Sequence, residues 1–184
     1  MASLKGYIPG LARILGTTPD ALYERQRALV RAGLLDQGEG RGPGSGVRAT
    51  APAVAFLLIS FLATDRLNES GSRAQTLANA RPKNGRRCPF TGMVRLVDAL
   101  ATVLTQSRKD AGVIEIMVSR TADRAEIKYR TGTGTARISE FTGPSPSEPG
   151  ISVAATLNKD LLQTVASDVR SIILESFNNS EDES

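Results

Sequence analysis

The chain of 184 residues contains no histidine, no tryptophan and a single cysteine, Cys88. Protein zinc sites are built mainly from cysteine and histidine, and nucleophilic catalysis by a Cys–His pair needs both residue types, so neither chemistry is expected. One cysteine cannot form a disulfide within the chain, which is typical of proteins of the reducing cytosol. We therefore predict a cytoplasmic protein that is not an enzyme and that uses no cofactor and no metal ion.

Aromatic residues and long apolar runs are also scarce. Aromatic residues make up 4% of the sequence, so the core must be aliphatic. The longest apolar run spans the 13 residues 51–63, which is too short to cross a bilayer and predicts a buried helix. Residues 1–16 lack the basic start and apolar run of a signal peptide. We expect no association with a membrane.

Charge is distributed unevenly along the chain. Residues 1–91 carry 13 basic and 6 acidic side chains, whereas residues 143–184 carry 2 basic and 7 acidic ones. An asymmetry of this kind indicates a basic binding face at one end of the sequence and an acidic tail at the other.

The most informative segment is 11–50. Leu11, Ile14 and Leu15 have helical spacing and predict a short helix that ends at Gly16. Thr18 is a good N-cap, and the proline that follows it suits the first position of a second helix, which ends at Gly33.

A hairpin is predicted after the second helix. Leu34 and Leu35 are expected to begin a strand, and residues 47–50 to form the returning strand. Between them, residues 36–46 contain five glycines and a proline, a composition typical of a turn or a flexible tip.

This order of elements, carried by LARILGTTPDALYERQRALVRAGLL and the glycine-rich stretch after it, resembles the reading unit of bacterial and phage winged helix-turn-helix transcription regulators. The sequence departs from that family in one place. Gly6 and Pro9 leave the usual preceding helix poorly developed, so residues 51–67 are expected to complete the core. The resemblance implies double-stranded DNA as the partner, with the second helix in the major groove.

The expected DNA contacts lie on the second helix, the hairpin and a basic loop. Arginine can bind guanine and glutamine can bind adenine through paired hydrogen bonds, while Asp20 and Glu24 could accept from cytosine or orient Arg27. Arginines beside a glycine-rich tip suit phosphates or a minor groove. The alternative is an ordinary helix and loop with solvated charges. The predicted contacts are Thr17, Thr18, Tyr23, Gln26, Arg27, Arg31, Arg41, Arg48, Lys83, Arg86 and Arg87.

Other chemistry is weakly indicated. The glycines of residues 38–46 are followed by neither Lys-Ser nor Lys-Thr, as a phosphate-binding loop would require. Ala111-Gly112 is the dipeptide that self-cleaving repressors cut, but their Gly-Asp-Ser-Met motif is absent. Cys88 lies among basic residues that could favour its thiolate, yet a cysteine without a chemical role is the simpler interpretation.

The second half changes from helical to alternating periodicity. After a basic loop at 81–92, a helix is predicted, followed by a meander of three strands, a possible fourth strand and a last helix capped by Asn158. The two helices could cover one face of the sheet. The expected helix spans 93–106, the strands span 113–120, 124–131, 135–141 and 151–157, and the chain is expected to fray from Phe177 onward.

The predicted fold is therefore α+β, a winged helix-turn-helix followed by an antiparallel sheet of three to four strands with two helices. A DNA-binding domain spans 1–80 and a loop spans 81–92. A domain for dimerisation or for a protein partner spans 93–177, and an acidic tail spans 178–184.

We predict a nucleoid-associated, sequence-specific transcription regulator that acts as a homodimer, since paired half-sites raise affinity and specificity. The apolar run 51–63 is a second candidate for the dimer interface, although it could equally form core. Two other classes stay open. One is a DNA-packaging protein like a phage small terminase, or an architectural DNA-binding protein. The other is an adaptor whose winged helix binds protein and not DNA.

Overall fold

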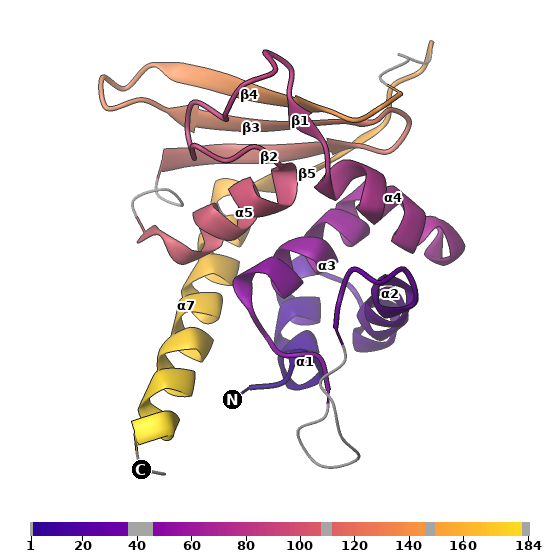
Figure 1. Cartoon of the computed structure of the whole chain (residues 1–184), viewed down its shortest axis with the longest axis vertical. Coiled ribbons are helices and arrows are strands. Elements are labelled where there is room, and N and C mark those ends of the chain that lie inside the picture. Colours follow the sequence, from indigo (N-terminus) through magenta and orange to yellow (C-terminus); the bar gives the residue numbers. More distant parts are fainter. Residues whose placement is uncertain (1, 37–45, 108–111, 146–149, 182–184) are drawn as a thin grey trace.

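A sheet covered by helices on one face forms the frame of the molecule (Figure 1). This computed structural model describes residues 2–36, 46–107, 112–145 and 150–181, with side chains as far as residue 174. Within these ranges, six α-helices and a five-stranded antiparallel sheet confirm the predicted α+β class. No helix in the described ranges combines the length and the apolar character needed to cross a bilayer.

The three N-terminal helices each begin at a hydroxyl cap. Ser3, Thr18 and Thr50 accept a hydrogen bond from the backbone N–H three residues further on, which satisfies a donor that the first helical turn leaves free. The prediction that Thr18 caps the second helix, with a proline at its first position, is confirmed. The helices are α1 (Leu4–Leu15), α2 (Pro19–Arg31) and α3 (Ala51–Ala63).

The first helix is longer than predicted. Gly6 and Pro9 suggested a poorly developed segment before a short helix, but both residues lie inside α1. Pro9 has no N–H to donate to the carbonyl of Lys5, one turn earlier. The hydroxyl of Tyr23 in α2 donates to that carbonyl instead, at 3.2 Å. A side chain from the neighbouring helix thus compensates for the proline.

The predicted hairpin strands at 34–35 and 47–50 are wrong. Leu34 and Leu35 form bends after α2, and the segment expected to return beside them pairs with the N-terminus of the chain. An isolated antiparallel bridge joins Arg48 to Ser3. Two backbone hydrogen bonds flank this bridge, one from Leu4 N to the Val47 carbonyl (2.7 Å) and one from Ala49 N to the Ala2 carbonyl (3.1 Å).

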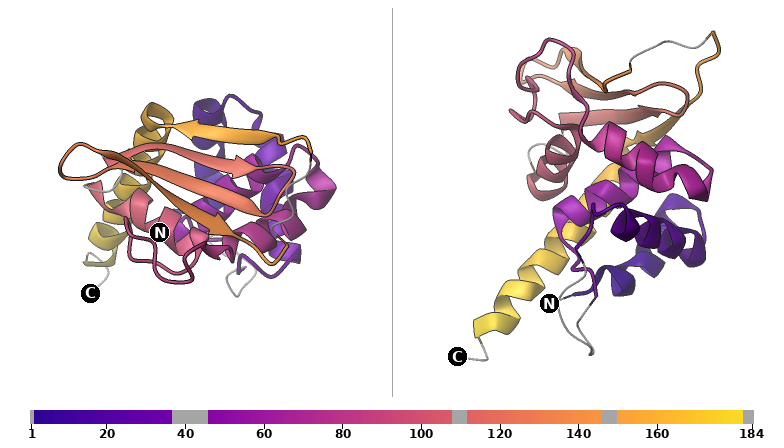
Figure 2. Two further views of the ribbon diagram at one scale, coloured as in Figure 1. Left: turned by 90° about the horizontal axis from the view of Figure 1, so that it is seen from above. Right: turned by 45° about the vertical axis from the view of Figure 1, so that its right-hand side comes forward.

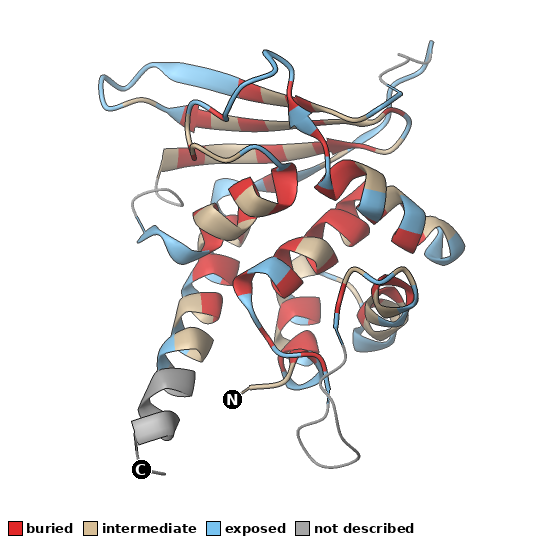
Figure 3. Ribbon diagram, viewed as in Figure 1, coloured by how far each residue is buried: buried red, intermediate tan, exposed pale blue. Residues whose placement is uncertain are grey.

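Helix α3 lies at the centre of the molecule. Ten of its residues are buried, and it contacts α2, α4, α5, β2 and β5. A helix that is apolar on nearly all sides is stable only inside a core. Figure 3 shows this helix mostly in the colour of buried residues. It ends at Ala63, before the predicted limit at Leu67, and its side chains of Phe56 and Phe61 are half-buried.

A short 3₁₀ turn, η1 (Leu67–Glu69), leads into α4 (Ser70–Ala78). Gly71, in the first turn of α4, allows this helix to approach α2 closely. A Cβ atom at Gly71 would lie 3.0 Å from the backbone oxygen of Ala28. The helices α2, α3 and α4 therefore pack as one group.

The sheet follows the predicted meander with one addition. Its strand order is β1-β4-β3-β2-β5, and all neighbours are antiparallel. The four predicted strands are present, and a fifth, β1, was not predicted because only two of its residues pair with the sheet. The strands are β1 (Arg81–Pro82), β2 (Val113–Ser119), β3 (Arg124–Arg130), β4 (Ala136–Thr142) and β5 (Ala154–Asn158).

The two faces of the sheet differ. The inner face carries buried apolar side chains such as Ile116, Ile127 and Phe141. Helices α3 and α7 (Lys159–Glu181) contact this side, and α5 (Leu96–Thr105) lies beneath it (Figure 1). In the part of the chain that the structure describes, no helix lies over the outer face (Figure 2, left). Its charged side chains form ion pairs: Arg124 with Glu126 and Glu140, Lys83 with Glu140, and Lys128 with Glu115.

The last helix begins as predicted and continues further than predicted. The side chain of Asn158 accepts from the backbone N–H of Leu161 at 3.0 Å. The helix then runs to Glu181, although fraying was expected from Phe177. Its buried side of Leu162, Val165 and Val169 belongs to the same apolar core as Leu4 and Leu29 of the N-terminal helices. The core is thus continuous across residues 81–92, and the division into separate domains there stays a prediction.

Candidate functional site

Helix α2 presents a charged stripe on the side away from the core. Arg25 is only 4% exposed, and Arg27, two residues further on, lies about 200° around the helix from it. Arg27 is exposed. Asp20 and Glu24 before it and Arg31 after it have helical spacing and lie on the same side of α2. We call these four residues the α2 stripe.

The α2 stripe contains two acidic and two basic residues. Nη1 of Arg27 lies 2.6 Å from a carboxylate oxygen of Glu24, and the two side chains are 71% and 44% exposed, respectively. Exposed ion pairs at this spacing contribute about 0.5 kcal/mol or less, so Arg27 can exchange Glu24 for another anion at little cost. Arg31 is exposed and has no ion pair among the residues that the structure describes.

Some of the predicted contacts lie together on α2. Gln26, Arg27, Val30 and Arg31 line a shallow hollow of about 280 Å³. The structure therefore brings together three of the polar α2 side chains that were expected to contact bases, Gln26, Arg27 and Arg31.

Other predicted contacts have structural partners. The hydroxyl of Tyr23 donates to the Lys5 carbonyl, and that of Thr18 accepts from the Ala21 N–H. Thr17, in the turn between the helices, is half-buried, and Arg48 is exposed beside the start of α1. Arg41 lies outside the described residues.

Arg25 is a residue that sequence reasoning missed. Its Nη1 donates to the Ser60 carbonyl (2.7 Å) and its Nη2 to the Thr64 carbonyl (2.8 Å), at the end of α3. The guanidinium also lies 5.5 Å from the ring centre of Phe61. Burial lowers the pKa of Arg25, and the carboxylate of Asp65 acts in the opposite direction. Arg25 holds α2 against α3 and so fixes which side of α2 faces solvent.

The sequence did contain a signal for Arg25. It lies three residues after Leu22 and four before Leu29, both of which are fully buried. That spacing places all three on one side of the helix.

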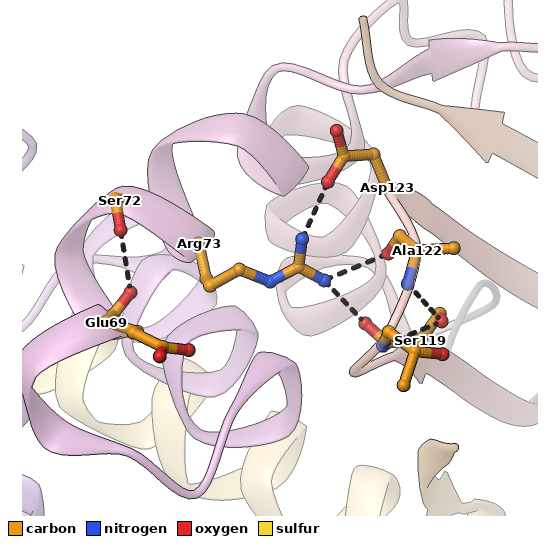
Figure 4. A network of polar contacts seen from close by, with 7 residues as sticks. Glu69, Ser72, Arg73, Ser119, Ala122 and Asp123 are labelled. Atoms are coloured by element: carbon orange, nitrogen blue, oxygen red, sulfur yellow. Dashed lines mark hydrogen bonds and ion pairs between the residues drawn. The ribbon is translucent and has the colours of Figure 1, made fainter. Parts of the chain in front are cut away.

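Two further arginines join the helices to the sheet. Arg73 of α4 forms an ion pair with Asp123 (2.6 Å) and donates to the carbonyls of Ser119 (3.0 Å) and Ala122 (2.9 Å), all at the β2–β3 turn (Figure 4). Arg120, after β2, donates to the Leu62 carbonyl of α3 at 3.2 Å and pairs with Asp65. These contacts hold α3 and α4 against the sheet, and α2 packs against both of these helices.

The predicted basic loop residues lie at the sheet and not beside α2. Lys83 follows β1, and its Nζ lies 2.9 Å from Glu140 of β4. This hydrogen bond, together with the nearby charge of Arg124, lowers the pKa of Glu140, against the opposing effect of burial. Arg86 and Arg87 are exposed in the turn that follows. The chain therefore has two separate surfaces with available basic side chains.

Cys88 is a core residue. Its side chain is 1% exposed, and its Sγ lies 3.4 Å from the hydroxyl of Ser139. Reactive cysteines are partly exposed in electropositive surroundings, so the burial of Cys88 argues against a reactive role. Among the described residues, acidic and cysteine side chains form no group of three or more that could hold a metal ion.

Comparisons of the chain with protein-family models, with curated proteins and with solved structures find no match. The function of the chain is therefore inferred from its own residues and their geometry.

Proposed function

We propose that this protein binds double-stranded DNA through α2, as a dimeric winged helix-turn-helix regulator. The observation that carries the proposal is the arrangement of α1 and α2, which are joined by a tight turn and leave the stripe of α2 exposed. Gly16 ends α1 with a φ of 66°, a left-handed conformation that favours glycine. The N–H of Thr17 then donates to the Ala12 carbonyl at 2.9 Å, a closure typical of helix ends before a sharp turn.

The exposed start of α2 suits a nucleic-acid surface. Thr18, Pro19 and Asp20 are all exposed, and an α-helix fits the major groove of DNA with its N-terminal part toward the bases. Arg27, Arg31 and Gln26 follow on the same helix, where their donors can meet guanine and adenine edges. Because the α2 stripe also contains acidic residues, its net charge is small. Such a surface favours sequence-specific contacts with bases over non-specific binding to the phosphate backbone.

The residues that flank the glycine-rich segment support a wing without the paired strands that were predicted at 34–35 and 47–50. One hollow of about 400 Å³ is lined by residues 34–36 and by residues 47, 48 and 50, so the two ends of the glycine-rich segment lie near each other. Arg48 is exposed at this base, where an arginine can contact phosphate.

The test is a selection of bound duplexes from a random pool, followed by titrations with the enriched sequence. We expect enrichment of one motif. Arg27→Ala and Arg31→Ala should each weaken binding by about 1–3 kcal/mol if they contact bases. Arg95→Ala is a matched control, because Arg95 is also exposed and forms an ion pair with an acidic residue three positions away, Asp98.

Two results would contradict the proposal. The first is a pool that stays random while the full chain remains folded, which would favour the adaptor class. The second is an equal loss of affinity in the Arg95→Ala control, which would assign the effect to net charge.

A further inference from the structure

Strand β1 covers only part of the edge of β4. Arg81 and Pro82 pair with the end of β4, and the N–H of Lys83 donates to the Glu140 carbonyl at 3.0 Å. Gly85, with a φ of 70°, then directs the chain away, and its N–H donates to the Pro82 carbonyl at 2.8 Å. Within the described residues, positions 136–139 of β4 therefore pair with β3 alone.

The uncovered edge has free backbone groups. Successive residues of an antiparallel strand direct their N–H and C=O groups to opposite sides. Glu140 and Thr142 face β1, so Ala136 and Ile138 direct theirs to the same open side. The side chain of Ile138 is 54% exposed although it is large and apolar.

A hollow lies along this edge. It has a volume of about 450 Å³, and its walls are residues 82–84 and Pro89 on one side and residues 138–140 on the other. We call it the β4-edge groove. Its volume lies within the range of pockets that bind small ligands, and its two prolines and Ile138 make part of its lining apolar.

Three basic residues adjoin the lining residues of the groove in the sequence: Arg86 and Arg87 lie between Asn84 and Pro89, and Arg137 precedes Ile138. The carboxylate of Glu140 is already engaged by Lys83 and Arg124. Arg86, Arg87 and Arg137 are exposed, and none of them has an ion pair in the part of the chain that the structure describes. An incoming carboxylate would thus meet free guanidinium groups.

We propose that the β4-edge groove binds an extended acidic peptide of a partner protein, which continues the path of β1 along β4. Its backbone would pair with Ala136 and Ile138, as in other cases of strand addition to a sheet edge. An apolar side chain would pack on Ile138 and Pro89, and acidic side chains would meet Arg86 and Arg87. The groove is separate from α2, so this binding is independent of DNA binding.

The lining favours a peptide over a nucleic acid. Single-stranded nucleic acids bind by stacking their bases on aromatic side chains, and no aromatic residue lines the described groove. A sugar–phosphate backbone also lacks the alternating donors and acceptors that pair with a strand edge.

The test uses the full chain and a fluorescein-labelled peptide of alternating glutamate and valine, followed by fluorescence anisotropy. We expect saturable binding that weakens as salt rises. A glutamine-for-glutamate peptide should bind more weakly, and so should one with a central proline. In hydrogen exchange, the N–H groups of Ala136 and Ile138 should become protected when the peptide binds.

Two variants locate the site. Ile138→Pro removes an N–H that faces the open side and leaves the β3 ladder in place, and Arg87→Glu reverses an exposed charge in the loop that contributes Asn84 and Pro89 to the groove. Each should weaken binding by about fivefold or more. The matched controls are Ala154→Pro, on the opposite edge of the sheet, and Arg13→Glu, at an exposed position of α1. Neither control should change peptide affinity.

Several outcomes would overturn the proposal. They are the absence of binding, equal affinity in the variants and the wild type, and tighter binding at this edge by a single-stranded oligonucleotide of equal charge. Circular dichroism shows whether Ile138→Pro folds. If it does not, Arg87→Glu and the exchange of the Ile138 N–H still decide the question.

Discussion

Two arginines of α2 that lie two positions apart have different roles. Arg27 is exposed and exchanges its partner easily, whereas Arg25 is buried and binds two carbonyls at the end of α3. Those carbonyls belong to the last turn of a helix, where no backbone N–H is available to them within the helix. The two Nη groups of the buried guanidinium donate to these carbonyls, while its buried Nε has no hydrogen-bond partner among the described residues.

Replacement of Arg25 should therefore be costly. We expect Arg25→Ala to lower the free energy of unfolding by about 2–4 kcal/mol, because the Ser60 and Thr64 carbonyls lose charged donors and the Phe61 ring loses a neighbour. Arg27→Ala should change it by about 0.5 kcal/mol or less. Urea denaturation of both variants measures the difference. Similar values for the two would show that Arg25 is not a structural anchor.

At the scale of single residues, the sequence indicated only weakly that Arg25 is buried and Arg27 exposed. The N-cap at Thr18 and the end of α1 at Gly16 depend on near neighbours, and both were predicted. The partners of Arg25 lie 35 and 39 residues away. Its helical phase with Leu22 and Leu29 indicated burial, but no local rule identified which carbonyls it would bind.

Helix α1 shows how one element depends on another. Pro9 has no N–H to donate to the Lys5 carbonyl, and the hydroxyl of Tyr23 in α2 donates to this carbonyl instead. The compensating group lies in a different helix, which explains why Gly6 and Pro9 alone suggested a poorly formed segment. Strands β2, β3 and β4 were predicted closely because their alternation is local. The pairing of residues 47–49 with the N-terminus was missed because it joins distant parts of the chain.

The link between Pro9 and Tyr23 can be measured with a double-mutant cycle. We expect Tyr23→Phe to lower the free energy of unfolding by about 0.5–1.5 kcal/mol, the usual value of one hydrogen bond. In a Pro9→Ala background the restored N–H can donate to the Lys5 carbonyl, so the same substitution should cost less. Thermal or urea unfolding of the four proteins gives the coupling energy. A coupling near zero would contradict the compensation.

For the whole molecule, one apolar core includes residues on both sides of the loop 81–92. Helix α3 contacts α2 and α4 on one side and α5, β2 and β5 on the other. Arg73 and Arg120 add polar links across the same boundary. The spacing of apolar residues predicted the helices and strands on either side of 81–92. It did not indicate which of these elements pack into the same core.

We expect the full chain to unfold in a single cooperative transition. A fragment of residues 1–80 should not fold alone, because the apolar side of α3 that faces α5 and the sheet would be exposed to water. Circular dichroism and gel filtration of this fragment, beside the full chain, provide the test. A soluble fragment with a sharp transition of its own would instead support an independent N-terminal domain.

The last turn of α3 has a consequence for how the chain can vary in length. Two arginines contact this turn within six residues. Arg25 of α2 donates to the carbonyls of Ser60 and Thr64, and Arg120 at the end of β2 donates to the Leu62 carbonyl and pairs with Asp65. One residue gained or lost there would rotate these acceptors by about 100° and detach both arginines together. Insertions and deletions are thus excluded from this turn, while the exposed turn at 131–135 can change length freely.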